Sequence, residues 1–474
     1  MIWSAFQRYS TMIISFISGI ILARLLTPYD YGCIGMLSIF MMLAESFIDA
    51  GFGSALIQKK RPTQEDYSTI FFWNLGTAVL LYAVMYLSAP TIASFYNIPL
   101  LRDVLRVQGI ILFIYAFNIV QRNQLQKKLN FKVLSIVTIS TSITSLSITI
   151  LMAYHGYGVW SLVVQYILTA AIPALIFWFY IKWRPVWSFS WKSFNELFSF
   201  GFYMFLTHLL NQFGTQIQGL LIGKFYSPIT MGYYSKAHAT EKLASQSISQ
   251  VITQVTYPLY AEVQDDKAIL GNMIKRLTMT LSYFTFPLLF LLLLLAKPIF
   301  LLLYSDRWLP SVPYFQALCI GGLAYSLQSV NNNSIAAIGK SKAMFWWTVL
   351  KRSAGIGSIF IGFFLFGMKG LLVAVVFGMW FAFFVNISLV SRFIGYKWWN
   401  QLKDILPILL VSSGDAAITY FIVSLNNFSC YIDGVLKLLL YTLLYLGWSV
   451  LFKPEPYLYA KNVITPLMSK LKRR

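Results

Sequence analysis

Long apolar stretches alternate with short polar connections along almost the whole chain. A membrane-spanning helix needs about 20 mostly apolar residues, and stretches of that length recur from the first residues to Leu451. The pattern predicts spans at approximately 3–26, 31–53, 68–88, 104–121, 131–153, 157–181, 198–222, 240–261, 277–296, 311–338, 343–367, 369–391, 402–425 and 434–452. We therefore expect an all-α integral membrane protein with about 14 transmembrane helices.

Composition agrees with a membrane protein. The 474 residues are 58% hydrophobic and 11% charged, whereas soluble domains carry about 25% charged residues. The net charge of +21 could indicate nucleic-acid binding, but the basic residues form short clusters between apolar runs. Such clusters are not the continuous basic patch that nucleic acid requires, so we expect no nucleic-acid partner.

The basic residues predict an orientation in the membrane. With the predicted spans, 25 lysines and arginines lie toward one side of the membrane and ten toward the other, in the connections or near the ends of the spans, while Lys351 and Arg352 are assigned to neither side. Cytoplasmic connections carry the excess of basic residues. We therefore expect both termini to be cytoplasmic.

An internal repeat divides the chain. The segment GIILARLLTPYDYG at residues 19–32 matches GLLIGKFYSPITMG at residues 219–232 without a gap, so that Arg24 corresponds to Lys224 and Pro28 to Pro228. Repeats are how many transporters build a site between two halves. The spacing predicts two six-helix lobes, residues 1–190 and 191–396, followed by two additional helices and a basic tail, residues 397–474.

Three motifs carry a family resemblance. ILARLLTPYDYG at residues 21–32, DAGFGSALIQ at residues 49–58 and GYGVWSLV at residues 156–163 resemble the polysaccharide-transporter branch of the multidrug/oligosaccharidyl-lipid/polysaccharide exporter superfamily. The chain is similar to Wzx-type flippases along nearly its whole length. This resemblance implies two lobes around a central cavity in the bacterial inner membrane, and outward movement of polyprenyl-pyrophosphate-linked oligosaccharides by alternating access.

The repeat also places polar side chains within the predicted membrane interior. Arg8, Thr11, Ser15 and Ser18 share one helical face, and the repeat matches them with His208, Asn211, Thr215 and Gln218. Ionisable residues inside a membrane are candidates for a substrate pathway, so Arg8, His208, Asn211 and Gln218 are candidate substrate contacts. Alternatively, His208 bonds a neighbouring helix and Arg8 reaches the cytoplasmic headgroups.

Two further bases and two acids complete the candidates. Lys351 and Arg352 cannot be excluded from their span without making it too short, and an arginine can bind pyrophosphate in bidentate fashion. Alternatively, they reach the interface marked by Trp346 and Trp347. Glu45 and Asp49 lie one helical turn apart and are candidates for binding a coupling proton or sodium ion, although Asp49 could instead be solvated near the cytoplasmic end.

Several chemistries are not expected. Ser334 stands where a phosphate-binding loop ending in IGKS would have its first glycine, so no ATP hydrolysis is expected. The three histidines lack the spacing of a zinc site. We expect no catalytic residue, metal or cofactor.

Three functions remain in competition. A flippase of lipid-linked saccharide units is favoured, with membrane lipids as surroundings and a polysaccharide polymerase and export components as candidate partners. A drug/cation antiporter of the same superfamily would be expected to carry more acids in its cavity. A membrane-embedded saccharide polymerase would need a large outer loop, and the longest predicted outer connection, about residues 89–103, is short.

Overall fold

A computed structural model describes residues 2–425 and 428–458, except for the side chains of 2, 4, 5, 200, 203, 246–258, 261, 341 and 342. Within these residues the chain forms α-helices, one 3-10 helix and no strand. The elements are α1 (Ile2–Leu25), α2 (Pro28–Asp49), α3 (Phe52–Gln58), α4 (Gln64–Tyr96), α5 (Leu100–Gln108), α6 (Ile111–Lys127), α7 (Phe131–Tyr154), α8 (Val159–Tyr180), α9 (Trp191–Phe225), α10 (Pro228–Glu262), α11 (Lys267–Leu294), α12 (Ala296–Tyr304), η1 (Asp306–Ser311), α13 (Val312–Ala337), α14 (Ser341–Ile394), α15 (Trp398–Ser424) and α16 (Cys430–Phe452).

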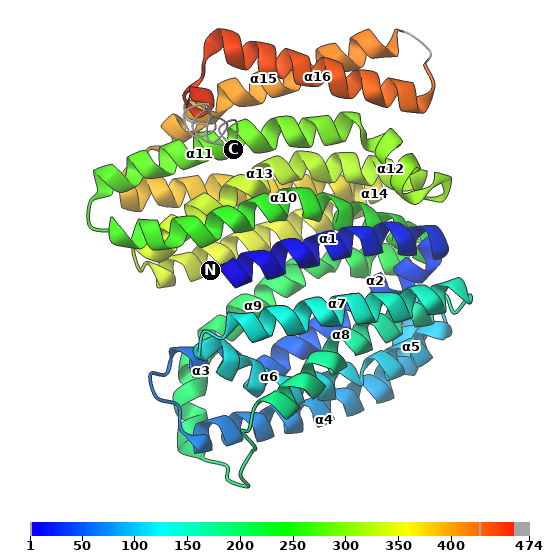
Figure 1. Cartoon of the computed structure of the whole chain (residues 1–474), viewed down its shortest axis with the longest axis vertical. Helices are drawn as coiled ribbons and strands as arrows, with labels where there is room; N and C mark the ends of the chain where they lie inside the picture. Colours follow the sequence, from blue (N-terminus) through cyan, green and yellow to red (C-terminus); the bar gives the residue numbers. More distant parts are fainter. Residues whose placement is uncertain (1, 426–427, 459–474) are drawn as a thin grey trace, which may run out of the picture. The chain divides into compact units, whose positions relative to one another are not determined.

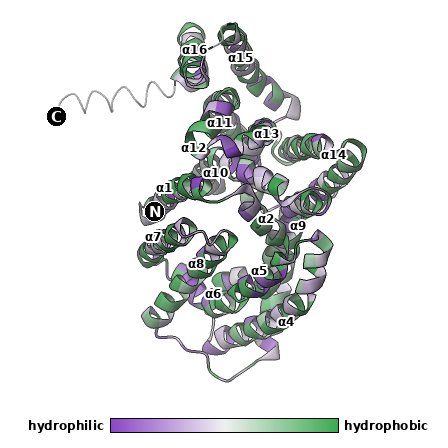
Figure 2. Cartoon of the chain, turned by 90° about the vertical axis from the view of Figure 1, so that its right-hand side faces the viewer, coloured by the Kyte–Doolittle hydropathy of each residue, from purple (hydrophilic) through white to green (hydrophobic). Residues whose placement is uncertain are grey.

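The helices agree with the expected class of fold, and each predicted span overlaps a helix. Hydrophobic residues run along the helices in Figure 2. Among the described residues, ten helical segments are long and apolar enough to cross a membrane. One of them, in α14, is 52 residues long and is broken at Gly367, where φ is 60° and ψ is −139°. Helices α9, α10 and α13 are not among the ten found in the described residues, so fourteen crossings remain a prediction.

The chain separates into two compact units, Met1–Ser235 and Lys236–Arg474. The first contains α1 to α9 and the beginning of α10, and the second contains the rest of α10 and the elements that follow (Figure 1). The predicted lobe boundaries, 1–190 and 191–396, remain predictions. We describe each unit by itself.

The family motifs lie at helix ends in the first unit. Thr27 and Asp30 form a reciprocal cap at the start of α2, in which the Thr27 backbone N–H donates to Asp30 Oδ2 over 2.8 Å. Such a pair satisfies N–H groups that have no partner inside the helix. The same carboxylate approaches Gly158, where a Cβ would lie 2.9 Å from Asp30 Oδ1 and φ is +53°. The first and third motifs are therefore in contact, and only glycine fits at position 158.

The two copies of the repeat touch each other through their glycines. A Cβ at Gly32 in α2 would lie 1.8 Å from the backbone oxygen of Pro228, and a Cβ at Gly232 in α10 would lie 1.8 Å from the backbone oxygen of Pro28. All four residues belong to the first unit. The contact is reciprocal, so each copy of the motif supplies the glycine that the proline of the other requires.

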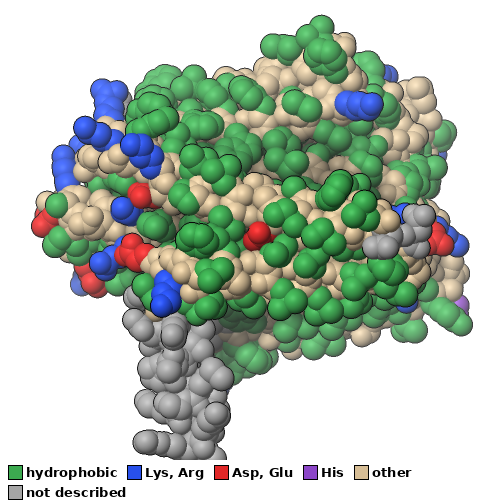
Figure 3. Space-filling model, turned by 90° about the horizontal axis from the view of Figure 1, so that it is seen from above, with side chains coloured by type: hydrophobic (Ala, Val, Ile, Leu, Met, Phe, Trp, Pro, Cys, Tyr) green, Lys and Arg blue, Asp and Glu red, His purple; other side chains and the backbone are tan. Residues whose placement is uncertain are grey.

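In the second unit, α11 packs against α13 and α15, and α15 packs against α16. The Tyr283 hydroxyl donates to Ser449 Oγ over 2.7 Å, and the Tyr445 hydroxyl donates to the Tyr283 carbonyl over 2.8 Å. These bonds attach α16 to α11. The face seen in Figure 3 is mostly hydrophobic, with most charged side chains toward its left and right margins and an acidic side chain near its middle. Charges at the margins are expected for helices that meet lipid along their length and water at their ends.

We expect Gly32→Ala to destabilise the protein. The methyl group would meet backbone atoms, which cannot rotate away, and overpacking of this kind costs about 1–3 kcal/mol or more. Gly76→Ala is the matched control, because a Cβ there meets nothing within 4 Å and alanine favours a helix by roughly 0.5–1 kcal/mol. The measurement is the thermal stability of the detergent-solubilised protein. Equal melting temperatures for both variants would contradict the close approach.

Candidate functional site

Helices α2 and α9 lie against each other in opposite directions and create the site. Their contacts run from Gly51 beside Gly201, where a Cβ at Gly51 would lie 2.2 Å from the Gly201 oxygen, to Ser38, whose hydroxyl donates to Gln216 over 3.1 Å. Phe47 and Phe205 lie between, with ring centroids 5.2 Å apart. This register brings the polar residues in the middle of α9 opposite the acids of α2.

A cavity of about 170 Å³ opens at this level of the first unit. Its lining comes from α2, the turn after it, α6 and α9, and consists of Met42, Glu45, Ser46, Asp49, Gly51, Tyr115, Phe205, His208 and Gln212. The volume is large enough for several water molecules. Both acids that the sequence singled out therefore share one cavity with His208.

The end of α2 positions the Asp49 carboxylate. Ala50 and Gly51 adopt left-handed conformations, with φ of 42° and 78°, so the chain turns sharply into α3. Asp49 Oδ1 then accepts a hydrogen bond from the Gly53 backbone N–H over 3.2 Å. Two bases, His208 and Arg122, lie within electrostatic range of Asp49, as does the phenol of Tyr115. Asp49 lines the cavity and is partly exposed, and the alternative of an Asp49 solvated near the cytoplasmic end stays a prediction.

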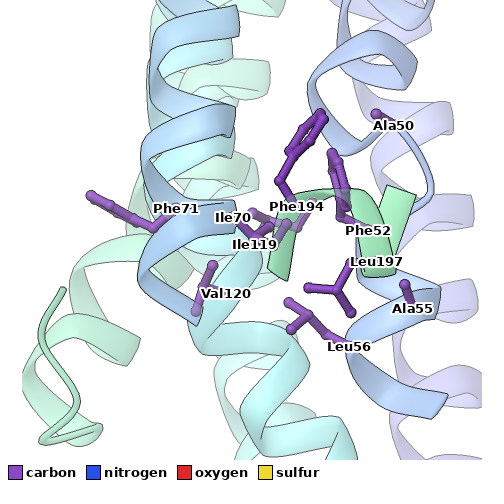
Figure 4. Close-up of a cluster of buried hydrophobic side chains, with 10 residues drawn as sticks. All are labelled: Ala50, Phe52, Ala55, Leu56, Ile70, Phe71, Ile119, Val120, Phe194 and Leu197. Atoms are coloured by element: carbon purple, nitrogen blue, oxygen red, sulfur yellow. The ribbon is translucent and has the colours of Figure 1, made fainter. Parts of the chain in front are cut away.

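A cluster of buried hydrophobic side chains supports the turn beside the cavity. It joins α3, α4, α6 and α9 through Ala50, Phe52, Ala55, Leu56, Ile70, Phe71, Ile119, Val120, Phe194 and Leu197. Phe52 and Phe194 lie next to each other (Figure 4), with ring centroids 5.5 Å apart. Because these side chains are almost completely buried, α3 is held against α9 and the cavity wall is fixed.

Lys59 connects three elements at the far end of α3. Its Nζ lies 3.0 Å from carboxylate oxygens of both Asp66 in α4 and Glu196 in α9. Burial by itself would lower the pKa of Lys59, but the hydrogen bonds to Asp66 and Glu196 outweigh that effect and the pKa is raised. Lys127 Nζ donates to the carbonyls of Leu56 and Ile57, the two residues that precede the last residue of α3. These contacts stabilise a helix of only seven residues.

The remaining polar candidates of the first unit do not line this cavity. Arg8 in α1 is partly exposed, and its Nη2 is buried without a hydrogen-bond partner among the described residues. Asn211 is adjacent in sequence to Gln212, and its carbonyl accepts from Thr215 Oγ1 over 3.0 Å. Gln218 is 8% exposed. The polar faces that the repeat predicted therefore lie on α1 and α9, and His208 is the residue of these faces that lines the cavity.

Lys351 and Arg352 belong to the second unit. Lys351 Nζ donates to Asn386 Oδ1 over 2.8 Å, which joins the two arms of α14 on either side of Gly367. Asn386 is 1% exposed and Lys351 is partly exposed, so the hydrogen bond between them is partly buried. Arg352 lies within electrostatic range of Tyr325 on α13. That these bases and those of the first unit act on the same substrate stays a prediction.

Sequence reasoning did not identify Tyr115 and Gln212. Tyr115 lies in a predicted span with no acid or base near it in sequence, and nothing in its own helix indicates a site. Gln212 follows Asn211 in sequence but does not belong to the predicted polar face of His208, Asn211, Thr215 and Gln218. The missing information was the antiparallel pairing of α2 with α9, which a single sequence does not specify. Within the described residues, no group of three His, Cys, Asp or Glu side chains could hold a metal ion.

Comparisons with known proteins place this architecture. The chain is 26% identical over 347 residues to the teichuronic acid biosynthesis protein TuaB of Bacillus subtilis, which covers 73% of this chain and 72% of that protein. It is 22% identical over 362 residues to the lipopolysaccharide biosynthesis protein WzxC of Escherichia coli, and this match covers 76% of this chain and 74% of that protein. The solved structure of the lipid II flippase MurJ in an inward closed conformation aligns with a TM-score of 0.75 at 16% identity, covering 95% of this chain and 98% of that one.

The helices and their order therefore define a multi-span membrane protein with the fold seen in MurJ. The model of the family described as polysaccharide biosynthesis protein matches residues 21–313. The chain belongs to this family, and the resemblance that the three motifs indicated is confirmed.

Proposed function

We propose that the protein is a flippase that moves polyprenyl-pyrophosphate-linked oligosaccharide units from the cytoplasmic to the outer leaflet for surface polysaccharide assembly. Membership of the polysaccharide biosynthesis family carries this proposal. The names of TuaB and WzxC, which refer to teichuronic acid and lipopolysaccharide biosynthesis, support the substrate class. The protein acts as a transporter and not as an enzyme, in the bacterial inner membrane, alongside a polysaccharide polymerase and export components.

The mechanism follows from electrostatics. A diphosphate that crosses an apolar barrier needs compensating positive charge, because isolated charges are costly inside a membrane. Arg8, His208, Lys351 and Arg352 supply that charge from both units, and the sugar contacts Asn211 and Gln218. Separated bases allow release, because the phosphate can exchange one contact for another as the protein changes between inward-open and outward-open states.

A strain lacking the gene is expected to lose surface polysaccharide and to accumulate the lipid-linked unit on the cytoplasmic leaflet. At matched protein levels, Arg352→Ala and Arg8→Ala should restore roughly tenfold less polymer than the parent, since a charged hydrogen bond contributes about 1.5–3 kcal/mol. Arg352→Lys should be impaired less, and Lys351→Arg should be tolerated. The measurement is the amount of surface polymer restored.

Arg61→Ala is the control for these variants, because Arg61 is an exposed base in the connection before α4. If the single alanine variants of Arg8, His208, Lys351 and Arg352 all restore the polymer fully, the phosphate site lies elsewhere. If the deletion strain keeps its polymer and instead becomes sensitive to cationic drugs, the antiporter function is the correct one.

We further propose that transport is coupled to a proton or sodium gradient through the cavity of the first unit. Glu45→Gln is expected to reduce polymer export several-fold, because the amide keeps the shape but does not exchange a proton or hold a cation. Glu65→Gln is the matched control, since Glu65 is exposed in the first turn of α4. Full export with Glu45→Gln, and with Asp49→Asn added, would remove this cavity from the coupling mechanism.

The orientation is a separate proposal, supported by the 25-to-10 distribution of basic residues. With native cysteines replaced, a cysteine at His155 is expected to react with an impermeant reagent added outside intact spheroplasts, and one at Gln126 is expected to react only after lysis. The opposite result would invert the topology. Lys461, which the same distribution places in the cytoplasm, lies outside the described residues.

A further inference from the structure

Another acid lies buried in the second unit and is not among the residues that line the cavity of the first. Glu241 in α10 is 4% exposed and packs onto Gly322 of α13. A Cβ added to Gly322 would lie 2.5 Å from Glu241 Oε1 and 3.5 Å from a methyl group of Leu289 in α11. Gly322 is therefore the residue that lets the carboxyl group enter the space between α10, α11 and α13.

The surroundings of Glu241 offer little compensation for a negative charge. Oε1 has no hydrogen-bond partner among the described residues, and the carboxyl group bonds the hydroxyl of Ser245. Lys242 in α10 and Cys319 in α13 lie within electrostatic range of Glu241. Helix α10 also carries the buried Lys236 and, one turn before Glu241, His238, while α11 brings the apolar Leu289 to Gly322. Within the described part of the chain, Glu241 forms no ion pair. A buried carboxylate without a paired cation is strongly disfavoured.

This environment fits a proton better than a metal ion. A hard cation requires a shell of six or more oxygen ligands, whereas Oε1 faces the Cα of a glycine and has no hydrogen-bond partner among the described residues. A proton needs no such shell and removes the charge outright. The packed position of Glu241 therefore suits the neutral acid, and the ionised form would gain from reaching water.

We propose that Glu241 is a proton-binding site of the second unit, which in its protonated form holds α10 against Gly322 of α13 and on losing the proton releases that contact. The charge change and the packing change are then one event, which is how a protonation drives a two-state element. Its place in a transport cycle rests on the proposed flippase function, but the switch itself does not.

Cys319 provides a native reporter of this contact. It lies on α13, is 1% exposed, and is within electrostatic range of Glu241. In a protein with Cys33→Ala and Cys430→Ser, purified in nanodiscs, the rate of Cys319 labelling by a small maleimide is measured as a function of pH. Dividing the rate by that of the same protein carrying Glu241→Gln cancels the pH dependence of the thiol chemistry.

The expected ratio is near one at acidic pH and rises several-fold as the pH increases. A negative charge at Glu241 would by itself slow formation of the thiolate, so a rising ratio reports exposure of Cys319. A ratio that stays at one at every pH overturns the proposal, as does a ratio that follows the sodium concentration at fixed pH. No substrate is needed, so the outcome is independent of whether the protein is a flippase.

Two further variants protect the test against misfolding. Gly322→Ala places a methyl group where Oε1 lies, and Cys319 should then be labelled rapidly at acidic pH as well. Glu65→Gln, at an exposed acid of α4 outside both proposed sites, should leave the pH dependence of Cys319 labelling unchanged. If Glu45→Gln abolishes that dependence and Glu241→Gln does not, the proton is bound in the first unit alone and the proposal is wrong.

Discussion

The close approach of two backbones at Gly32 and Gly232 is the constraint on which the first unit depends. Each glycine faces the carbonyl of the proline four residues before the other, so the beginnings of α2 and α10 cross with no side chain between them. A crossing without side chains leaves little freedom in the relative position of the two helices. The chain enters α10 directly from α9, which lies antiparallel to α2 and brings His208 into one cavity with Glu45.

Much of the architecture could be predicted because the membrane imposes a simple rule on sequence. Apolar runs of sufficient length become helices, and the ungapped repeat revealed the pair of glycines before their contact was known. The break in α14 was also predictable as a boundary between two spans, since Gly367 and Lys369 interrupt a long apolar stretch. What periodicity could not provide was the pairing of helices distant in sequence, which assigns Tyr115 and Gln212 to the site.

The polar candidates illustrate the difference between what the sequence predicts and what only the packing of the helices shows. Lys351 was identified because an ionisable residue cannot be left out of its span, yet its bond to Asn386 depends on how two arms of one helix fold back. Glu241 was visible in the sequence only as an acid one turn from His238, and its burial against Gly322 required the position of α13. A sequence reports that a buried charge exists. The packing decides whether it has a partner, and therefore whether it serves stability or function.

The break in α14 also has a consequence for how the chain enters the bilayer. Gly362 and Gly370 lie in close backbone contact across the bend, and Phe364, Leu365 and Phe366 at the tip are exposed apolar side chains. A connection this short and hydrophobic is not stable in water, so the first arm cannot stay in the membrane with the connection exposed until the second arm inserts. During biosynthesis the two arms are therefore expected to leave the translocation channel together as a preassembled hairpin, with Lys351 meeting Asn386 before α15 and α16 are available.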